Sequence, residues 1–330
     1  MLKIGKEGKA KFYYYEGKIS SKLPVFYNPK MVINRDITNL FINEINKKDE
    51  KIKKAVSLMA GTGVREIRWK KELSLKEIVA NDLNKKAVEL MKKNFELNNV
   101  EIKITQKDAR FYEEKSDFID LDPFGSPLPF LQPLIKGQYI KITATDLSVF
   151  CTYKKKSILK YKGFSRNKHF CHIEAIKILI KRVRDFFRMH ELNVEPILSY
   201  YCEHHITVFL KKTRKWKRKG FKIFDYSFLK DLDIDFYKEA FQKKRIIDNE
   251  KSLKLIELIK EEAFEGFYYY LPFIYSKHKI KPIKIYKIIE KIKEEGFKAS
   301  RSHFDSEIIK TELNKKEFLE ILTELNSKNL

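Results

Sequence analysis

The sequence contains little cysteine, glycine or proline. There are 3 cysteines, 11 glycines and 9 prolines in 330 residues. The cysteines are Cys151, Cys171 and Cys202, and none belongs to a CxxC pair. The sequence therefore predicts no zinc site and no other metal site. An odd, low cysteine count fits a reducing cytoplasm.

Long apolar runs are also missing from the sequence. No run approaches the ~20 residues that a membrane-spanning helix needs, and the N-terminus shows no signal-peptide pattern. We therefore expect a cytoplasmic protein without a membrane partner, and we predict a monomer. The tyrosine triplets at 13–15 and 268–270 are too isolated to indicate an internal repeat.

Negative charge is scarce relative to positive charge. The chain has 69 Lys and Arg against 45 Asp and Glu, which gives a formal net charge of +24. Such a surplus favours a polyanionic partner, most simply nucleic acid. A lysine-rich proteome is the alternative, because lysine and glutamate are both enriched in hyperthermophiles. That trend adds both signs of charge, so it does not account for the surplus.

The most informative stretch is residues 118–127, FIDLDPFGSP. It begins as a short apolar run, typical of a buried strand, and then stops at turn residues. Ligands of open α/β sheets bind at the carboxyl ends of strands. Asp122-Pro123-Phe124 at this point resembles the fourth motif of amino-group methyltransferases. The alternative is an ordinary turn, which an Asp-Pro pair alone more often marks.

The three residue types suit chemistry on an exocyclic amine. The carboxylate of Asp122 and a backbone carbonyl can each accept one N–H of the amine and favour a pyramidal nitrogen. Pro123 fixes φ and so helps fix the turn, while the ring of Phe124 can stack on a base. We expect Asp120 to point to the opposite face of the strand from Asp122, so that the two acids need not share a role.

A glycine turn follows the first predicted core strand. Residues 54–60 form the strand, and the turn GTGVREIR at 61–68 opens a helix. This is the nucleotide-binding position of a Rossmann-like fold, and it includes Thr62 and Gly63. A third glycine and a Walker lysine are missing, which makes a pyrophosphate ligand less favoured. The next strand, 77–82, ends at Asp82, which is placed to bind ribose hydroxyls.

The third core strand, 101–105, follows a helix predicted at 84–97 and leads to Asp108-Ala109. The carboxylate of Asp108 could accept a hydrogen bond from an adenine amino group, and the next backbone N–H could donate to the ring. A helix N-cap is the alternative role for Asp108.

The remaining pattern completes an open α/β sheet. A fifth strand at 138–146 is followed by a basic, aromatic loop at 153–169, a helix at 173–190, and two strands at 196–201 and 204–210. Seven strands, with helices between the first five and an antiparallel hairpin at the end, are typical of class I methyltransferases.

The adjacent pair His204-His205 could suggest a metal site. Neighbouring side chains on a strand face opposite ways, however, so the two rings are poor joint ligands.

The basic run at 211–220 predicts a division into two domains, 1–220 and 221–330. The run itself could be a linker, a nucleic-acid contact or both. The second domain is predicted to bind tRNA and to be a smaller α+β unit. It contains helices at 280–295, closed by Gly296, and at 315–325, and resembles a winged-helix module. In the intervening segment, His303 beside Arg301 either contacts RNA or caps a strand.

Several motifs occur in the order found in one enzyme family. They are residues 26–31 with 34–36, residues 61–68, Asn81-Asp82, residues 120–127, residues 143–146, and residues 300–304 with 309–311. Together they resemble the tRNA (guanine(26)-N(2))-dimethyltransferase family, over about residues 7–320. One position departs from the family pattern, because Ser57 stands where an acid usually ends the first strand.

The resemblance implies a cofactor, S-adenosyl-L-methionine (AdoMet), and a partner, tRNA, whose guanine 26 receives one or two methyl groups on N2. It implies that AdoMet is bound by Arg35, Arg65, Asp82, Asp108 and Ala109, together with Thr62 and Gly63 of the glycine turn. It also implies that Asp122 holds the guanine amine and that Phe26 and Phe124 enclose the base.

Two alternatives stay open from the sequence. The chain could methylate another base amine, such as adenine N6 or a guanine of rRNA. It could also be a non-catalytic RNA-binding protein on the same fold, for which Ser57 is the best argument.

Overall fold

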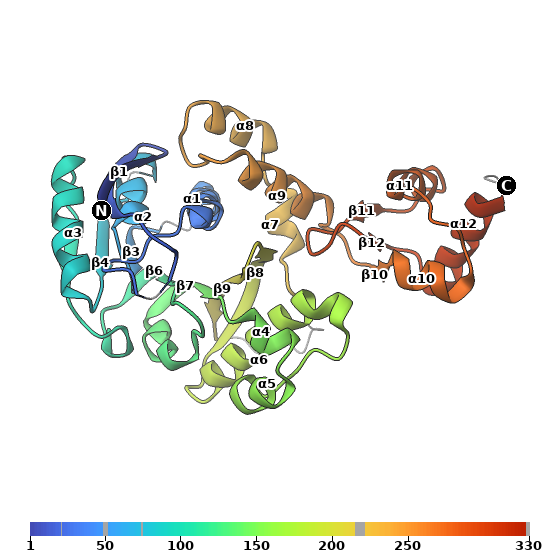
Figure 1. Cartoon of the computed structure of the whole chain (residues 1–330), viewed down its shortest axis with the longest axis horizontal. Helices are drawn as coiled ribbons and strands as arrows, with labels where there is room; N and C mark the ends of the chain where they lie inside the picture. The colour runs from blue at the N-terminus through green and yellow to red at the C-terminus, as the bar shows by residue number, and fades with distance from the viewer. Residues whose placement is uncertain (21, 49–51, 74, 215–221, 328–330) are drawn as a thin grey trace.

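The computed structural model describes the chain except for residues 21, 49–51, 74, 215–221 and 328–330 (Figure 1). Its centre is a seven-stranded sheet in the order β5-β4-β3-β6-β7-β9-β8. The strands are β3 (Lys54–Ser57), β4 (Glu77–Asn81), β5 (Lys103–Thr105), β6 (Ser116–Leu121), β7 (Gly137–Ala144), β8 (Asn193–Cys202) and β9 (His205–Thr213). The first five are parallel to one another, and β8 and β9 form the antiparallel hairpin that the sequence predicts. The predicted class I methyltransferase sheet is confirmed.

The connections between the parallel strands differ from the prediction in two places. Helices α2 (Val64–Arg68) and α3 (Lys85–Leu97) lie where they were expected. The link from β5 to β6 contains only a 3₁₀ turn at Ala109–Phe111, and the link from β6 to β7 contains 3₁₀ turns at Leu128–Phe130 and Gln132–Lys136. Prolines at 127, 129 and 133 explain the second case, because proline interrupts α-helical hydrogen bonding.

An N-terminal hairpin is attached to the edge of the sheet domain. Among the described strands, β1 (Leu2–Glu7) and β2 (Ala10–Tyr15) pair only with each other. The side chain of Asn94 on α3 binds both the backbone N–H and the carbonyl of Tyr13, at 2.7 and 3.1 Å. These two hydrogen bonds give partners to backbone groups at the free edge of β2, and they fix the hairpin against α3.

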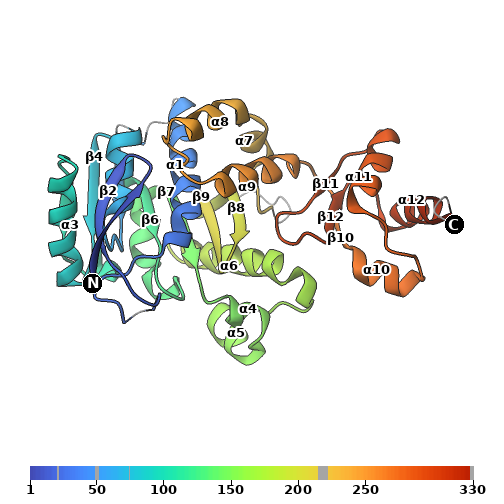
Figure 2. The same cartoon turned by 45° about the horizontal axis from the view of Figure 1, so that its top comes forward.

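The segment after β7 is helical where the sequence predicted a loop. It contains α4 (Leu147–Cys151) and α5 (Lys154–Tyr161), and it leads into α6 (Cys171–Arg188). We refer to residues 147–170 as the basic arm. Figure 2 shows α4 and α5 projecting beyond α6, away from the sheet. Lysine is a good helix former, so a lysine run does not by itself indicate a loop.

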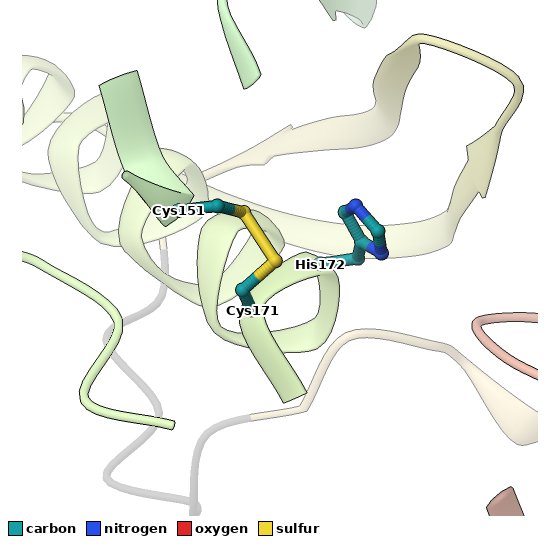
Figure 3. Close-up of side chains that lie close together, drawn as sticks. All are labelled: Cys151, Cys171 and His172. Atoms are coloured by element: carbon teal, nitrogen blue, oxygen red, sulfur yellow. A yellow bond between two sulfur atoms is a disulfide. The ribbon is translucent and has the colours of Figure 1, made fainter. Parts of the chain in front are cut away.

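A disulfide links α4 of the basic arm to the first residue of α6. Cys151 at the end of α4 is bonded to Cys171 at the start of α6, with the two Cα atoms 5.4 Å apart (Figure 3). The low cysteine count had suggested reduced thiols. Intracellular disulfides are nevertheless common in proteins of hyperthermophiles, a source that the abundance of lysine and glutamate also fits.

Three helices beyond residue 221 belong to the core of the first domain. They are α7 (Tyr226–Lys230), α8 (Ile234–Gln242) and α9 (Glu250–Glu261), and α9 packs on α1 (Val32–Lys47). Buried residues from Ile223 to Ala263 are part of the same hydrophobic cluster as the sheet. By packing, the buried residues from Ile223 to Ala263 therefore group with the sheet, as does Phe304 further along the chain, and the domain boundary at Gly220 stays a prediction. The predicted boundary run is described only as far as Arg214, and the rest lies outside the described residues.

The second core begins at Leu271 and ends at Leu322. Its sheet has the order β10-β12-β11, with strands β10 (Phe267–Tyr270), β11 (Ala299–Arg301) and β12 (Ile308–Thr311). Helices α10 (Leu271–His278), α11 (Ile285–Glu294) and α12 (Lys315–Ser327) accompany it at the far end of the molecule (Figure 1). The helices predicted at 280–295 and 315–325 are both present, as α11 and α12. Among the described helices, none is long and apolar enough to cross a membrane.

Candidate functional site

A cavity of about 800 Å³ opens at the carboxyl ends of β3, β4 and β6. Its walls come from the segment between β2 and α1, the glycine turn, the ends of β4 and β5, and the turn after β6. The predicted site residues that line it are Phe26, Arg35, Thr62, Arg65, Asp82, Asp108, Ala109, Asp122, Pro123 and Phe124. Gly63 is the one predicted residue that does not. Residues far apart in sequence therefore meet in one cavity, as expected at this edge of the sheet.

Asp122 is held by two buried cations. Its Oδ2 lies 2.6 Å from Nη2 of Arg65 and 3.5 Å from Nζ of Lys141. The Asp122 side chain retains 16% of its exposure, whereas the Lys141 side chain is fully buried. The two cations thus hold the Asp122 carboxylate on its buried side, while part of the carboxylate faces the cavity.

Asp120 joins the same cluster, and our expectation that it points away from Asp122 is wrong. Its oxygens lie 2.8 Å from Nη1 of Arg65 and 2.9 Å from Nζ of Lys141. Residues two apart on a strand lie on the same face, so the expectation misapplied the alternation. The parallel pairing of β6 with β7 places Asp120 opposite Lys141. A single guanidinium therefore bridges the two acids.

The cluster keeps Asp122 ionised. Burial alone would raise the pKa of the Asp122 carboxyl, but Lys141 and Arg65 outweigh it and lower the pKa below its ordinary value. Burial, and then the nearby charge of Arg65, lower the pKa of Lys141. At neutral pH the cavity presents a carboxylate, which can accept hydrogen bonds but is a weak base.

The glycine turn both lines the cavity and starts helix α2. Thr62 lines the cavity, and its carbonyl accepts a 2.8 Å hydrogen bond from the Asn94 side chain. Gly63 has φ +76° and starts α2, and a Cβ there would lie 2.6 Å from the Phe95 ring. Gly63 is therefore needed for backbone conformation and close packing against α3, rather than for lining the cavity.

Asp82 lies at the end of β4, where it was predicted. Its carboxylate accepts hydrogen bonds from the backbone N–H of Gly61 at 2.9 Å and of Asn84 at 2.9 Å. Burial raises the pKa of Asp82 despite these two bonds. The carboxylate thus ties the glycine turn to the next loop, and its place in the cavity wall leaves it able to accept from a ligand.

Asp108 lies in the cavity wall and also caps a turn. It lines the cavity with Ala109, and its side chain also caps the following 3₁₀ turn through the N–H of Arg110 at 2.9 Å. Hydrogen bonds from the Arg110 side chain and backbone lower the pKa of Asp108. The cap and the position in the cavity wall are compatible, because a carboxylate accepts several hydrogen bonds.

Arg35 lines the cavity, but its guanidinium binds the N-terminal hairpin. Its Nε and Nη2 donate to the two oxygens of Glu7 at 2.7 and 2.6 Å, and both side chains are almost fully buried. Nη2 also reaches the Asn28 carbonyl at 3.4 Å. Arg35 thereby couples the hairpin to the segment that carries Phe26.

Phe26 and Phe124 face each other across the opening. Their ring centroids are 5.8 Å apart at 69°, an edge-to-face contact, and their exposed fractions are 38% and 66%. Exposed aromatic rings at a cavity entrance are typical of base-stacking sites. A base between the two rings needs about 7 Å, two carbon contact distances. The rings must therefore separate slightly to admit one.

The turn that carries Phe124 is anchored to the start of the basic arm. The N–H of Gly125 donates to Oγ1 of Thr145 at 2.7 Å, and the N–H of Thr145 donates back to the Gly125 carbonyl at 3.0 Å. The Tyr161 hydroxyl lies 2.7 Å from Oγ of Ser126 and donates to Asp146. These bonds limit the movement of the ring of Phe124.

The two adjacent histidines have different environments, as predicted for neighbours on a strand. His204 lines the cavity, with its Nε2 3.3 Å from the Asn28 amide. His205 is buried, and burial lowers its pKa to about 3, so it is neutral. Sequence reasoning did not assign His204 to the site, and it missed Lys141. A single lysine inside the apolar strand 139–144 was the available signal.

One group of possible metal ligands occurs among the described residues, and the sequence did not suggest it. The ligand atoms of Cys151, Cys171 and His172 all lie within 4.8 Å of one another (Figure 3). The two sulfurs are bonded to each other, so neither is present as a thiolate, the form that binds metals. The His172 ring instead stacks on Tyr201 at 3.7 Å.

Comparisons with known proteins identify the family of this chain. A family model described as N2,N2-dimethylguanosine tRNA methyltransferase matches residues 4–231 and 220–323. A Sulfolobus acidocaldarius protein named tRNA (guanine(26)-N(2))-dimethyltransferase is 29% identical over 98% of both chains. An Aquifex aeolicus relative named tRNA (guanine(26)-N(2)/guanine(27)-N(2))-dimethyltransferase is 34% identical over 64% of this chain and 58% of its own length.

A solved structure shows the same fold along almost the whole chain. It is Trm1 from Pyrococcus horikoshii in complex with S-adenosyl-L-methionine, with a TM-score of 0.81 and 26% identity over 97% of this chain and 99% of that one. The family match covers both the sheet domain and the C-terminal module. The chain therefore belongs to the N2,N2-dimethylguanosine tRNA methyltransferase family.

Proposed function

We propose that this protein transfers methyl groups from AdoMet to the exocyclic N2 of guanine 26 in tRNA. The observation that carries the proposal is the Asp122 carboxylate, held ionised by Arg65 and Lys141 at a cavity whose entrance is formed by two exposed aromatic rings. The names of the relatives and the cofactor of the P. horikoshii structure support it.

The cavity fits AdoMet in size and in its polar groups. Its volume of about 800 Å³ lies within the usual range for ligand sites. We propose that Asp82 accepts from the ribose hydroxyls, and that Asp108 and the Ala109 N–H bind the adenine edge. Arg35, Thr62 and Arg65 form the adjoining wall. Gly63 supports this wall through the conformation of the turn.

The residues of the chain provide positioning and charge, while AdoMet supplies an electrophilic methyl group on a sulfonium sulfur. Guanine must leave the RNA stack to reach the cavity, and Phe26 and Phe124 can enclose its ring. Asp122 and the Pro123 carbonyl can then accept the two N–H groups of the amine. As methyl transfer proceeds, the carboxylate stabilises the positive charge that builds on nitrogen.

The C-terminal module contributes to tRNA binding in this proposal, and the enzyme works as a cytoplasmic monomer. Light scattering of the purified protein tests the oligomeric state.

Incubation of the protein with AdoMet and unmodified tRNA, followed by digestion and mass spectrometry of the nucleosides, tests the proposed function. We expect N2-methylguanosine and N2,N2-dimethylguanosine from this tRNA, and neither from a transcript in which guanine 26 is replaced by adenine. Methylated adenosine would instead favour the other base-amino activity. A protein that binds no AdoMet at millimolar concentration in calorimetry would favour a non-catalytic RNA-binding role.

Asp122→Asn is the decisive variant for the role of the carboxylate. We expect methylation to fall by orders of magnitude while AdoMet affinity stays near wild type, because the amide accepts hydrogen bonds but carries no charge. Asp117→Asn is a control on the same strand, since Asp117 binds the backbone of residues 53 and 54 at the opposite end of β6. A fully active Asp122→Asn variant would show that Asp122 only forms the turn.

A further inference from the structure

The basic arm carries a concentrated positive charge that the site described above does not use. Residues 147–173 contain no aspartate or glutamate. The arm contains seven cations: Lys154, Lys155, Lys156, Lys160, Lys162, Arg166 and Lys168. Within the described part of the chain, Lys160 is the one of these that forms an ion pair, with Asp146 at 2.8 Å. Among the described residues, none of the other six side chains forms an ion pair, although the backbone N–H of Arg166 donates to the Glu174 carboxylate at 2.9 Å. The charge of these six side chains is therefore available to an external anion.

The surface of α5 combines this charge with apolar and aromatic groups. Lys154, Lys155 and Lys156 are exposed, and Tyr153 and Leu159 retain 50% and 77% of their exposure. Side chains of this kind suit nucleic acid, because lysine binds phosphate while aromatic and apolar groups contact sugars and bases. Carboxylates would be expected on a surface that serves only solubility, where both signs are usually mixed.

The arm is connected directly to the turn that carries Phe124. Tyr161, the last residue of α5, contacts Ser126 through its hydroxyl, and Thr145 just before the arm binds Gly125. An eight-residue helix is about 12 Å long, so the exposed lysines at its start lie within that length of Tyr161. Phosphates bound by α5 would therefore flank a nucleotide placed in the cavity.

The far end of the arm reaches the C-terminal module. The His169 ring stacks on Tyr270 of β10, with centroids 3.9 Å apart at 18°. The disulfide closes the base of the arm (Figure 3). The arm is therefore fixed at the cavity turn, at α6 and at the second module, which gives a charged surface of defined orientation.

We propose that the basic arm binds the phosphate backbone of the substrate RNA beside the target nucleotide. This inference rests on the proposed function, since it identifies where the RNA substrate of the same cavity is held. The arm acts on RNA affinity and register, whereas Asp122 acts on the chemical step.

The test compares two double variants with the same change in charge. Lys154→Gln/Lys155→Gln alters the arm, and Lys92→Gln/Lys93→Gln alters exposed lysines on α3, on a different side of the molecule (Figures 1 and 2). The affinity of each protein for an unmodified tRNA transcript is measured over a series of salt concentrations. Calorimetry with AdoMet and the methylation rate at saturating tRNA check that the cavity is intact.

We expect the arm variant to bind tRNA on the order of 30-fold more weakly at 0.1 M salt, with a salt dependence less steep by about 1.5, because each lost phosphate contact contributes roughly 0.7–0.9 to the slope. The α3 variant should keep the wild-type slope. An unchanged slope in the arm variant, or an equal loss in both variants, would overturn the inference. A wild-type protein that binds tRNA without methylating it would instead refute the proposed function.

Discussion

Lys141 is a single residue with two effects, on the charge of Asp122 and on the stability of the sheet. Of the groups that lower the pKa of the Asp122 carboxyl, Lys141 is the strongest. It also pairs with Asp120, with both side chains fully buried. Removal of Lys141 leaves Asp120 and Asp122 with one neighbouring cation, Arg65, instead of two.

We therefore predict that Lys141→Met raises the pKa of Asp122 and moves the acid limb of the methylation pH profile to higher pH. It should also destabilise the protein by about 3–5 kcal/mol, the usual cost of breaking a buried ion pair from one side. Lys54→Met on β3 is the control, because Lys54 pairs with Glu77 and Glu114 at the opposite edge of the sheet. An acid limb that stays in place in Lys141→Met would show that Arg65 alone keeps Asp122 ionised.

Glu66 gives the protein a pH-dependent stability that does not depend on catalysis. Its side chain is buried, and burial raises its pKa from 4.5 to about 7. A folded-state pKa above the unfolded value means that stability is fully present below about pH 4.5. That stability is lost as the pH rises towards 7, because the carboxyl ionises freely in the unfolded chain while it stays protonated in the folded state.

We predict that Glu66→Gln loses less stability than wild type between pH 5 and pH 8, and that it is the more stable protein at pH 8 by up to about 3 kcal/mol. Urea denaturation at both pH values measures the difference. Glu89→Gln, an exposed position on α3, should behave like wild type. If wild type and Glu66→Gln show the same pH dependence, the carboxyl of Glu66 is stabilised as an anion in the folded state.

At the scale of the structural element, the aromatic entrance of the cavity is built from two loops that belong to different parts of the chain. Asn84 binds the Pro24 carbonyl at 2.7 Å, and Val25 is buried against Ala87 and Leu90 of α3. This fixes the backbone beside Phe26 and leaves its ring partly exposed. The ring can therefore contact a ligand without being part of the core.

We predict that Phe26→Ala and Phe124→Ala each slow methylation by roughly ten- to hundredfold, because stacking contributes about 1–3 kcal/mol per base. AdoMet affinity and melting temperature should change little, since neither ring is buried. Phe111→Ala removes a ring that is 71% exposed and lies outside the cavity lining, and serves as the control. A large fall in melting temperature for Phe26→Ala would instead assign that ring to the core.

The disulfide of the basic arm has its main effect on the unfolded chain. It joins residues separated by 20 positions, and a loop of about that length corresponds to roughly 3 kcal/mol of lost unfolded-state entropy. We predict that Cys151→Ser/Cys171→Ser is less stable than wild type by about this amount, in denaturation without reductant. Cys202→Ser should show little change. Two titratable thiols at 151 and 171 in the purified protein would contradict the prediction.

The sequence predicted the elements whose pattern is local. The apolar strands, the glycine turn and the Asp-Pro-Phe turn all lie where expected, because strand ends and turn residues mark them directly. The cluster of Asp120, Arg65 and Lys141 was not predicted, since it depends on which strands pair and on their register. The segment that forms the basic arm was predicted as a loop because the prediction gave more weight to its run of charges than to the helix propensity of lysine.

At the scale of the whole molecule, the helices beyond the basic run pack with the sheet in one hydrophobic core. Helix α9 packs on α1, and the Asp36 carboxylate on α1 accepts hydrogen bonds from Ser252 and from the N–H of Asn249. These bonds are buried or partly buried, so the helices beyond the basic run are structural parts of the first domain. A run of charged residues indicates a solvent-exposed segment, but it does not show where the hydrophobic core of a domain ends.

This packing has a consequence for how the protein is made. Arg68, fully buried beside the glycine turn, donates to the Ile246 carbonyl at 2.9 Å, and the Ile246 N–H donates to Glu72 at 2.8 Å. A ribosome releases the N-terminal half first, and domains generally fold as units during synthesis. The cofactor-binding sheet therefore emerges with a core that stays open until residues near 263 leave the exit tunnel. The nascent enzyme should acquire protease resistance, and with it AdoMet affinity, only at that chain length.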